Sequence, residues 1–408
     1  METVDIIIKN AKELITLKGP NKPRTKKQLG ILSIINKADL AIKNGFIFDV
    51  GKNLKYKSEE IIDATEKVVM PGFVDPHTHL VFAGSREFEL DMRLKGLSYV
   101  EIHKRGGGIF YTVSETRKAT LEKLFKESKQ RLDRMLSYGT TTCEAKSGYG
   151  LDTKSELKIL NVQKKLGFSH PVDIISTFLG AHAIPKEYNP KDYVNEIINE
   201  MIPKTKDLVT FCDVFCEKGF FTNKQSKEIL EAGKRFGLTP KIHADELSDT
   251  GGAALAADIG AISADHLLLS NDVGLKKMVD KGVMGVLLPA TPFSLMQKNY
   301  APAKKMIDLG VSIALATDLN PNCWNESMQF IIQLACLKMK MTPAEAITAS
   351  TFNAACAIGQ SNKIGSIEKD KQADIIILDC PSYKFLTYHF GVNLVKTVIK
   401  KGKIVKTI

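Results

Sequence analysis

The chain lacks any apolar run near the roughly 18 residues that a membrane-spanning helix needs. Its first five residues carry neither the basic stretch nor the apolar core of a secretion signal. Its seven cysteines are scattered, and no two have the spacing Cys-x-x-Cys. We therefore expect reduced thiols in a cytoplasmic protein that does not enter a membrane.

Arginine is scarce, because only eight of the 57 basic residues are arginines. The net charge of +11 comes from lysines that are spread over the whole length. A protein that follows a phosphate backbone usually gathers arginine and aromatic side chains into one stripe. No such stripe is present in the sequence, so we expect a lysine-rich solvated surface and no nucleic-acid partner.

The remaining composition is that of a soluble globular protein, with 44% hydrophobic and 25% charged residues. A chain of 408 residues exceeds one ordinary hydrophobic core. The length therefore predicts a large domain and a small one.

Both ends of the chain show the pattern of short β-strands. Asn44-Gly45 separates two apolar runs, which is a strong signal for a β-hairpin, and Lys401-Gly402 separates two more. The apolar run Ala373–Leu378 adds another strand. Neither end has enough apolar residues to fold alone. We therefore predict one small β-sandwich domain built from residues 1–67 and 358–408.

Between these ends, residues 68–357 alternate between strand and helix patterns. Eight apolar, β-branched runs predict strands at Val68–Asp75, Thr140–Ala145, Val172–Leu179, Phe211–Cys216, Thr239–Ile242, Ala261–Ala264, Gly282–Leu288 and Val311–Ala316. Helical patterns lie between them, for example at Ser155–Leu166, Lys224–Phe236, Asp272–Lys281 and Leu295–Leu309. Eight such units predict an α/β fold of the (β/α)₈ barrel type.

The pair His77 and His79 follows the first predicted strand. Side chains alternate along a strand, so both imidazoles face the same way. His243 follows the fifth strand and Asp318 the eighth, at the end of a barrel where active sites are built. Three imidazoles and one carboxylate suit a single Zn or Fe ion, either divalent or trivalent. The competing interpretation of Asp318 is a helix cap in its loop.

Two further residues near these ligands suggest proton-transfer chemistry. Glu246 lies three residues after His243, where it can stand beside a metal without binding it. His266 ends the sixth predicted strand and is a candidate to orient a water molecule or to polarise a carbonyl group. Alternatively, Glu246 is a surface glutamate and His266 is a buried histidine paired with the backbone.

Several residues after the first three strands are candidates for substrate binding. Arg86 follows the His77–His79 motif and can hold a carboxylate with two parallel hydrogen bonds. Tyr149 follows the second strand and His182 the third. Tyr99 lies in the long connection after the first strand, which we expect to act as a lid.

These motifs together resemble a known family. The run Pro71-Gly-Phe-Val-Asp-Pro-His-Thr-His79, with a barrel and a split small domain, resembles the amidohydrolase superfamily. Within it, five further blocks resemble the imidazolonepropionases. They are Glu144-Ala-Lys-Ser-Gly-Tyr-Gly-Leu151, Thr177-Phe-Leu-Gly-Ala-His-Ala-Ile-Pro185, Asp213-Val-Phe-Cys-Glu-Lys218, His243-Ala-Asp-Glu246 with Ser248-Asp-Thr-Gly-Gly252, and Ala264-Asp-His266.

The resemblance implies hydrolysis of 4-imidazolone-5-propanoate to N-formimidoyl-L-glutamate in histidine degradation, by a homodimer. It implies metal ligation by His77, His79, His243 and Asp318. It also implies substrate or product contacts from a set of seven residues that includes the loop after Asp318: Arg86, Tyr149, His182, Glu246, Asn320, Asn322 and Cys323.

That loop departs from the family pattern. Asn322 and Cys323 stand where the family usually has glycine and a small hydroxyl residue. Backbone contacts survive the change at Asn322, but a hydroxyl contact is weakened at Cys323. The substitution bears on the fit of the substrate and leaves the chemistry intact.

Two alternatives remain open from the sequence. The first is a nucleobase deaminase of similar architecture, which Arg86 argues against because a nucleobase has no carboxylate. The second is a barrel that has become a non-catalytic scaffold, which the retention of all four metal ligands argues against.

Overall fold

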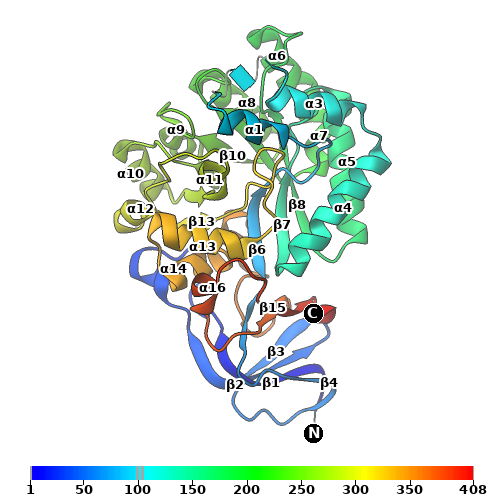
Figure 1. Ribbon diagram of the computed structural model, residues 1–408, viewed down its shortest axis with the longest axis vertical. Coiled ribbons are helices and arrows are strands. Elements are labelled where there is room, and N and C mark those ends of the chain that lie inside the picture. Colours follow the sequence, from blue (N-terminus) through cyan, green and yellow to red (C-terminus); the bar gives the residue numbers. More distant parts are fainter. Residues whose placement is uncertain (1, 98–100, 103–104, 408) are drawn as a thin grey trace.

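The computed structural model describes residues 2–97, 101–102 and 105–407. A barrel of strands surrounded by helices lies above a smaller sheet, and both chain termini lie in that smaller sheet (Figure 1). The predicted fold class is therefore confirmed.

The barrel consists of eight strands that follow one another in sequence order, with parallel neighbours. They are β6 (Phe73–Thr78), β7 (Thr140–Lys146), β8 (Asp173–Ala181), β9 (Phe211–Cys216), β10 (Thr239–Ala244), β11 (Ser263–His266), β12 (Met284–Leu287) and β13 (Ile313–Leu315). Each lies within or beside one of the eight predicted runs, because buried parallel strands appear in a sequence as continuous apolar segments.

The first and last barrel strands meet just beyond their ends. The backbone N–H of His79 donates to the carbonyl of Leu319 at 2.8 Å, and that of Asp318 donates to the carbonyl of His77 at 3.1 Å. Two predicted metal ligands from opposite ends of the barrel sequence are thereby joined through the backbone.

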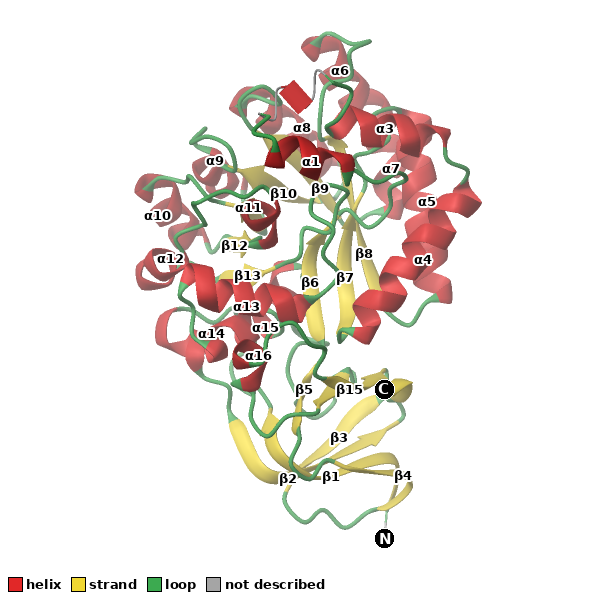
Figure 2. Ribbon diagram, in the orientation of Figure 1, coloured by secondary structure: helices red, strands yellow, loops and turns green. Residues whose placement is uncertain are grey.

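Helices cover the outside of the barrel (Figure 2). The α-helices are α1 (Phe88–Leu94), α3 (Ile109–Lys118), α4 (Leu121–Ser137), α5 (Thr153–Ser169), α6 (Pro190–Glu196), α7 (Ile202–Thr205), α8 (Asn223–Arg235), α9 (Gly252–Ile259), α10 (Asp272–Lys281), α11 (Ala290–Ser294), α12 (Ala303–Leu309), α13 (Met328–Met339), α14 (Pro343–Ala349), α15 (Phe352–Ala357) and α16 (Phe385–Tyr388). Shorter turns of 3₁₀ or π type are η1 (Lys26–Gly30), η2 (Ile197–Met201) and η3 (Lys206–Leu208). Among the described residues, none of these helices has the length and apolarity to cross a bilayer.

Three of the four predicted helices are confirmed, and each begins at a capping side chain. Asp152 caps α5, Asn271 caps α10, and Thr222 forms a reciprocal capping box with Gln225 at the start of α8. Such caps satisfy backbone N–H groups that have no partner within the helix.

The fourth predicted helix, Leu295–Leu309, is wrong in its first half and confirmed only over Ala303–Leu309. In the structure α11 ends at Ser294 and α12 begins at Ala303, directly after Pro302. Proline has no N–H and disfavours a helical conformation at the residue before it, so a helix can begin just after Pro302 but cannot run through it.

The terminal residues form one connected sheet of eight strands in the order β16-β15-β14-β5-β1-β2-β3, with β4 paired to β1. The strands are β1 (Thr3–Ile15), β2 (Ile34–Lys43), β3 (Phe46–Gly51), β4 (Lys57–Asp63), β5 (Val68–Pro71), β14 (Ile375–Leu378), β15 (Val395–Lys400) and β16 (Lys403–Thr407). The two predicted hairpins are confirmed. Asn44, Gly45, Lys401 and Gly402 all have φ between 49° and 84°, the left-handed conformation that a tight two-residue turn requires.

The predicted strand Val68–Asp75 is in fact two strands that belong to different sheets. Val68–Pro71 pairs with β14 in the terminal sheet, and Phe73–Thr78 pairs with β7 in the barrel. Gly72 lies between them, and a Cβ atom there would overlap Cγ2 and Oγ1 of Thr141. The change of sheet therefore depends on a residue without a side chain.

We expect Gly72→Ala to destabilise the fold by about 1–3 kcal/mol, the usual cost of forcing an extra carbon into a packed site. The free energy of unfolding in a urea titration measures this cost. Gly167→Ala is the control, because Gly167 lies in α5 and a Cβ atom added there would meet open space. Equal stability of Gly72→Ala and the parent protein would contradict the packing argument.

Candidate metal centre and active site

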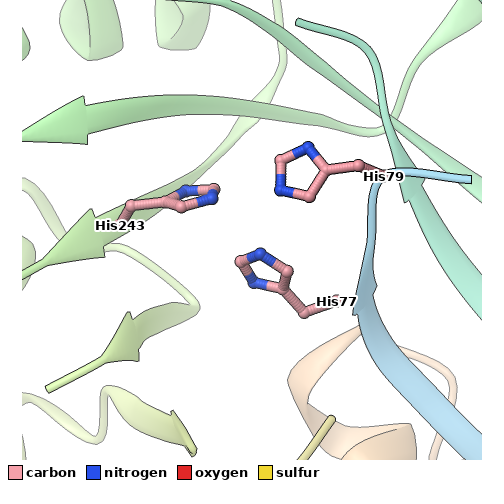
Figure 3. A group of neighbouring side chains, drawn as sticks. All are labelled: His77, His79 and His243. Atoms are coloured by element: carbon pink, nitrogen blue, oxygen red, sulfur yellow. The ribbon is translucent and has the colours of Figure 1, made fainter. Parts of the chain in front are cut away.

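Three histidines converge at the C-terminal end of the barrel. His77 is the second-last residue of β6, His79 comes directly after that strand, and His243 lies on β10, so their rings reach one point from two strands (Figure 3). One ring nitrogen from each of these three histidines lies within 4.8 Å of the other two. In a second group, ring nitrogens of His77 and His266 and a carboxylate oxygen of Asp318 also lie within 4.8 Å of one another. All five side chains are almost fully buried.

The polar atoms at this point have the properties of a metal site. His77 Nε2, His243 Nε2 and Asp318 Oδ1 are buried and have no hydrogen-bond partner among the described residues. Asp318 Oδ1 lies 3.6 Å from His77 Nε2 and 3.5 Å from His79 Nε2. Buried polar atoms without partners are costly, and a bound cation would satisfy these together. The residues present therefore fit a metal ion with mixed nitrogen and oxygen ligation.

Buried carboxylates lie behind two of the imidazoles. Asp265 Oδ2 lies 2.6 Å from Nδ1 of His77, and Asp213 Oδ2 lies 3.0 Å from Nδ1 of His243. The hydrogen bond on Nδ1 of His77 turns its Nε2 toward the common point, as in many metal sites, and Asp213 places a negative charge behind His243. Burial, followed by the nearby charge of Lys146, holds the pKa of His77 well below its usual value, so that ring is neutral and able to ligate.

A lysine without solvent contact links these carboxylates. Lys146 Nζ donates to Asp213 Oδ2 and to Glu144 Oε1, both at 2.8 Å, and lies 3.6 Å from Asp265 Oδ2. Burial opposes its charge, but the attraction of Asp213, Glu144 and Asp265 is stronger and raises the pKa of Lys146. Its positive charge therefore balances the acidic groups behind the histidines.

Thr291 orients Asp318 and was not identified from the sequence. Its hydroxyl donates to Oδ2 of Asp318 at 2.5 Å, which leaves Oδ1 directed at His77 and His79. Nothing in the local pattern around Thr291 marks this role. Asp318 and His266 also adopt left-handed backbone conformations, with φ of 52° and 78°. Such conformations are strained for residues other than glycine and are frequent at functional sites.

Glu246 and His266 face each other beside this point. Glu246 Oε2 lies 3.7 Å from His266 Nε2, and the Glu246 side chain is 14% exposed. Burial, and then repulsion from Asp318 and Glu217, raises the pKa of Glu246 to about 8. The carboxyl group therefore keeps its proton at neutral pH and can donate it. Burial also lowers the pKa of His266, so that ring is neutral.

A cavity of about 510 Å³ opens above these groups. It brings together most of the predicted site residues, namely His79, Arg86, Tyr149, His182, His243, Glu246, His266, Asp318, Asn320 and Asn322. His182 stacks on His79 with ring centroids 4.9 Å apart, and Tyr149 lies beside both rings. Tyr99 lies outside the described residues.

The loop after Asp318 is organised by Asn320. Its side-chain oxygen accepts the backbone N–H groups of Asn322 at 2.7 Å and Cys323 at 3.0 Å. The Cys323 thiol is buried and directed at the carbonyl of Thr317. Cys323 lines a neighbouring cavity and is not part of the wall of the larger one. Its predicted substrate contact stays a prediction.

Arg86 is paired more closely than the sequence suggests. Its Nε and Nη2 donate to the two carboxylate oxygens of Glu89 at 2.7 and 2.9 Å. This edge of the guanidinium is therefore committed to Glu89, which is itself fully buried. A second arginine, Arg93, lines the same cavity and was not identified from the sequence. Its position four residues after Glu89 on α1, the spacing of an ion pair on one helix face, is the signal that points to it.

The comparisons with known proteins agree with this architecture. The family model described as the amidohydrolase family matches residues 68–405. An adenosine deaminase from Xanthomonas campestris with bound zinc has a TM-score of 0.76 at 17% identity, covering 99% of this chain and 93% of that one. A 5-methylcytosine deaminase from Klebsiella pneumoniae has a TM-score of 0.76 at 14% identity, covering 98% and 97%. These structures share the fold, and the chain belongs to the amidohydrolase family.

Sequence relatives narrow the assignment. An imidazolonepropionase of Geobacillus kaustophilus (strain HTA426) is 51% identical over 98% of this chain and 97% of its own length. An imidazolonepropionase of Alkaliphilus metalliredigens (strain QYMF) is 49% identical over 98% of each chain. Within the amidohydrolases, the chain thus falls among the imidazolonepropionases.

Proposed function

We propose that this chain hydrolyses 4-imidazolone-5-propanoate to N-formimidoyl-L-glutamate, a step of histidine degradation. The reaction breaks a C–N bond of a cyclic amide. One observation carries the proposal: a single cavity is lined by converging metal-ligand atoms, by the buried carboxyl group of Glu246 and by two arginines. With that substrate, the ring carbonyl would lie beside the metal-ligand atoms, the carboxyl group of Glu246 would protonate the departing nitrogen, and the arginines would bind the carboxylate tail.

His77, His79, His243 and Asp318 hold one Zn or Fe ion in this proposal. Both metals accept imidazole and carboxylate ligands. When bound, such an ion lowers the pKa of a coordinated water from about 15.7 toward 7 and polarises a carbonyl oxygen.

Glu246 is the proton donor in this proposal. A ring nitrogen leaves poorly as an anion, so the C–N bond needs protonation as it breaks. The carboxyl group of Glu246 is protonated at neutral pH because its pKa is raised to about 8. His266 stands beside it at 3.7 Å and orients the carbonyl oxygen of the ring, where negative charge develops.

The remaining wall of the cavity positions the substrate. His182 donates from Nδ1 to the carbonyl of Gly148 at 3.0 Å, which fixes the ring that stacks on His79. Together with Tyr149 it forms an aromatic face against which the planar imidazolone ring packs. Arg86 contributes positive charge toward the propionate tail.

A nucleobase deaminase is the second candidate, because deaminases share this fold. Two arginines on the cavity wall argue against it. Glu89 offers one negative charge to these two arginines, so a neutral nucleobase would not supply the second negative charge that this part of the site lacks.

Metal removal tests the proposal directly. We expect dialysis against a chelator to abolish hydrolysis of imidazolone propanoate, because buried imidazole nitrogens and a carboxylate oxygen converge there without hydrogen-bond partners among the described residues. Re-addition of Zn²⁺ or Fe²⁺ in separate samples should restore turnover, and elemental analysis of the untreated protein identifies the resident metal. Release of ammonia from guanine or cytosine, without turnover of imidazolone propanoate, would instead support the deaminase.

We also propose that the protein is a cytoplasmic homodimer. All seven cysteines are free thiols, six of them buried, which suits a reducing compartment. Light scattering on the purified protein measures the oligomeric state.

A further inference from the structure

Arg93 occupies an unusual position in the wall of the active-site cavity. It lies on α1 and lines both the 510 Å³ cavity and its neighbour. Its side chain is only 13% exposed. Its Nε atom is buried and has no hydrogen-bond partner in the described part of the chain. A buried donor without a partner beside a cavity indicates a group that is completed by a ligand.

The charges around Arg93 do not balance. Glu89 accepts two hydrogen bonds from Arg86 and one from the backbone N–H of Gly108 at 2.7 Å. Arg93 Nη1 lies 3.6 Å from the same carboxylate. Among the residues that the structure describes, Glu89 is the carboxylate beside both arginines, and one negative charge cannot neutralise two positive ones. An anionic ligand in the cavity would supply the second negative charge.

Asn322 holds Arg93 in place. Arg93 Nη1 donates to Oδ1 of Asn322 at 2.7 Å, a bond that joins α1 to the loop after Asp318. The amide oxygen orients the guanidinium without cancelling its charge. Neither a glycine nor an aspartate at position 322 would do both, because glycine has no acceptor and aspartate carries a counter-charge.

We propose that Arg93, oriented by Asn322, is a specificity-determining residue that binds the carboxylate of the substrate together with Arg86. This proposal rests on the proposed function, since it names the part of that substrate which the cationic wall recognises. Arg86 uses Nε and Nη2 of its guanidinium for hydrogen bonds to Glu89. Arg93 supplies further N–H donors in the same cavity wall.

Two stable probes separate carboxylate recognition from general stability of the site. Imidazole-4-propanoate carries the carboxylate, and 4-propylimidazole lacks it. Calorimetric titration of the metal-loaded protein gives a Kd for each. We expect Arg93→Gln to weaken the carboxylate probe by about 10- to 100-fold, the value of a charge-assisted hydrogen bond, and to leave the neutral probe unchanged. Arg93→Lys should bind the carboxylate probe more tightly than Arg93→Gln but less tightly than the parent protein. Lysine keeps the positive charge but cannot form the two parallel hydrogen bonds of a guanidinium group.

A second variant keeps the test decisive if Arg93→Gln folds poorly. Asn322→Asp is expected to weaken the carboxylate probe selectively, because its new charge pairs with Arg93 and competes with the ligand. Lys95→Gln is the matched control, since it removes a positive charge from an exposed position just after α1, outside the cavity wall. It should change neither Kd.

Turnover of imidazolone propanoate is measured on the same proteins. A raised KM with a smaller change in kcat for Arg93→Gln supports the proposal. Equal weakening of both probes, or no effect on either, overturns it. Selective loss of the carboxylate probe without any wild-type turnover would uphold the role of Arg93 and reject the proposed function, so the two failures are distinguishable.

Discussion

Replacing His243 with alanine is expected to remove both the metal and the activity. The substitution deletes one of four converging donors and leaves Asp213, whose pKa is held far below its usual value, without its imidazole partner. Although burial alone would raise that pKa, His243 and Lys146 lower it. We expect a loss of about 10³-fold or more in kcat/KM, because a metal contributes several kcal/mol of charge stabilisation and each 1.4 kcal/mol is about tenfold.

Metal content by elemental analysis and kcat/KM for imidazolone propanoate are the two measurements. His389→Ala serves as the control, because His389 is an exposed histidine in the terminal region. It should retain both metal and turnover. A His243→Ala protein with full metal occupancy and normal turnover would show that His243 is not a ligand.

Replacing Glu246 with glutamine is expected to keep the metal and lose at least ~10²-fold in turnover, the usual scale of general acid–base catalysis. Glutamine has nearly the same shape but cannot deliver a proton to the departing ring nitrogen. Glu228→Gln is the matched control, since it is the same exchange at an exposed position of α8. A rise in KM alone, with kcat preserved, would make Glu246 a binding residue.

The pH profile gives an independent test of the same role. Burial raises the pKa of Glu246 to about 8, so the proton is present at neutral pH and is lost as the pH rises through that value. The kcat/KM of the parent protein should therefore decline on the alkaline side. The residual activity of Glu246→Gln should lack this decline. An identical alkaline limb in both proteins would assign it to another group.

Some features of this protein are determined by local sequence. Strands such as β12 and β13 are short apolar runs because both of their faces are buried, and the two hairpins follow from residues that tolerate positive φ. The helices α5, α8 and α10 begin where side chains can cap them. Two histidines of the metal centre, His77 and His79, could also be recognised from local sequence, because the two-residue period of a strand places them on one face.

Other features were decided only by contacts between distant segments. Asp265 lies 188 residues from the histidine it orients, and Asn322 lies 229 residues from Arg93. The division of the Val68–Asp75 run at Gly72 depends on the side chain of Thr141. The pairing of Arg86 with Glu89 is local, yet it forms because the fold buries both groups away from water. Periodicity and turn chemistry describe how a residue relates to its neighbours in the chain. The partner of a buried charge depends instead on which strands the closed barrel brings together, and only the tertiary structure determines that.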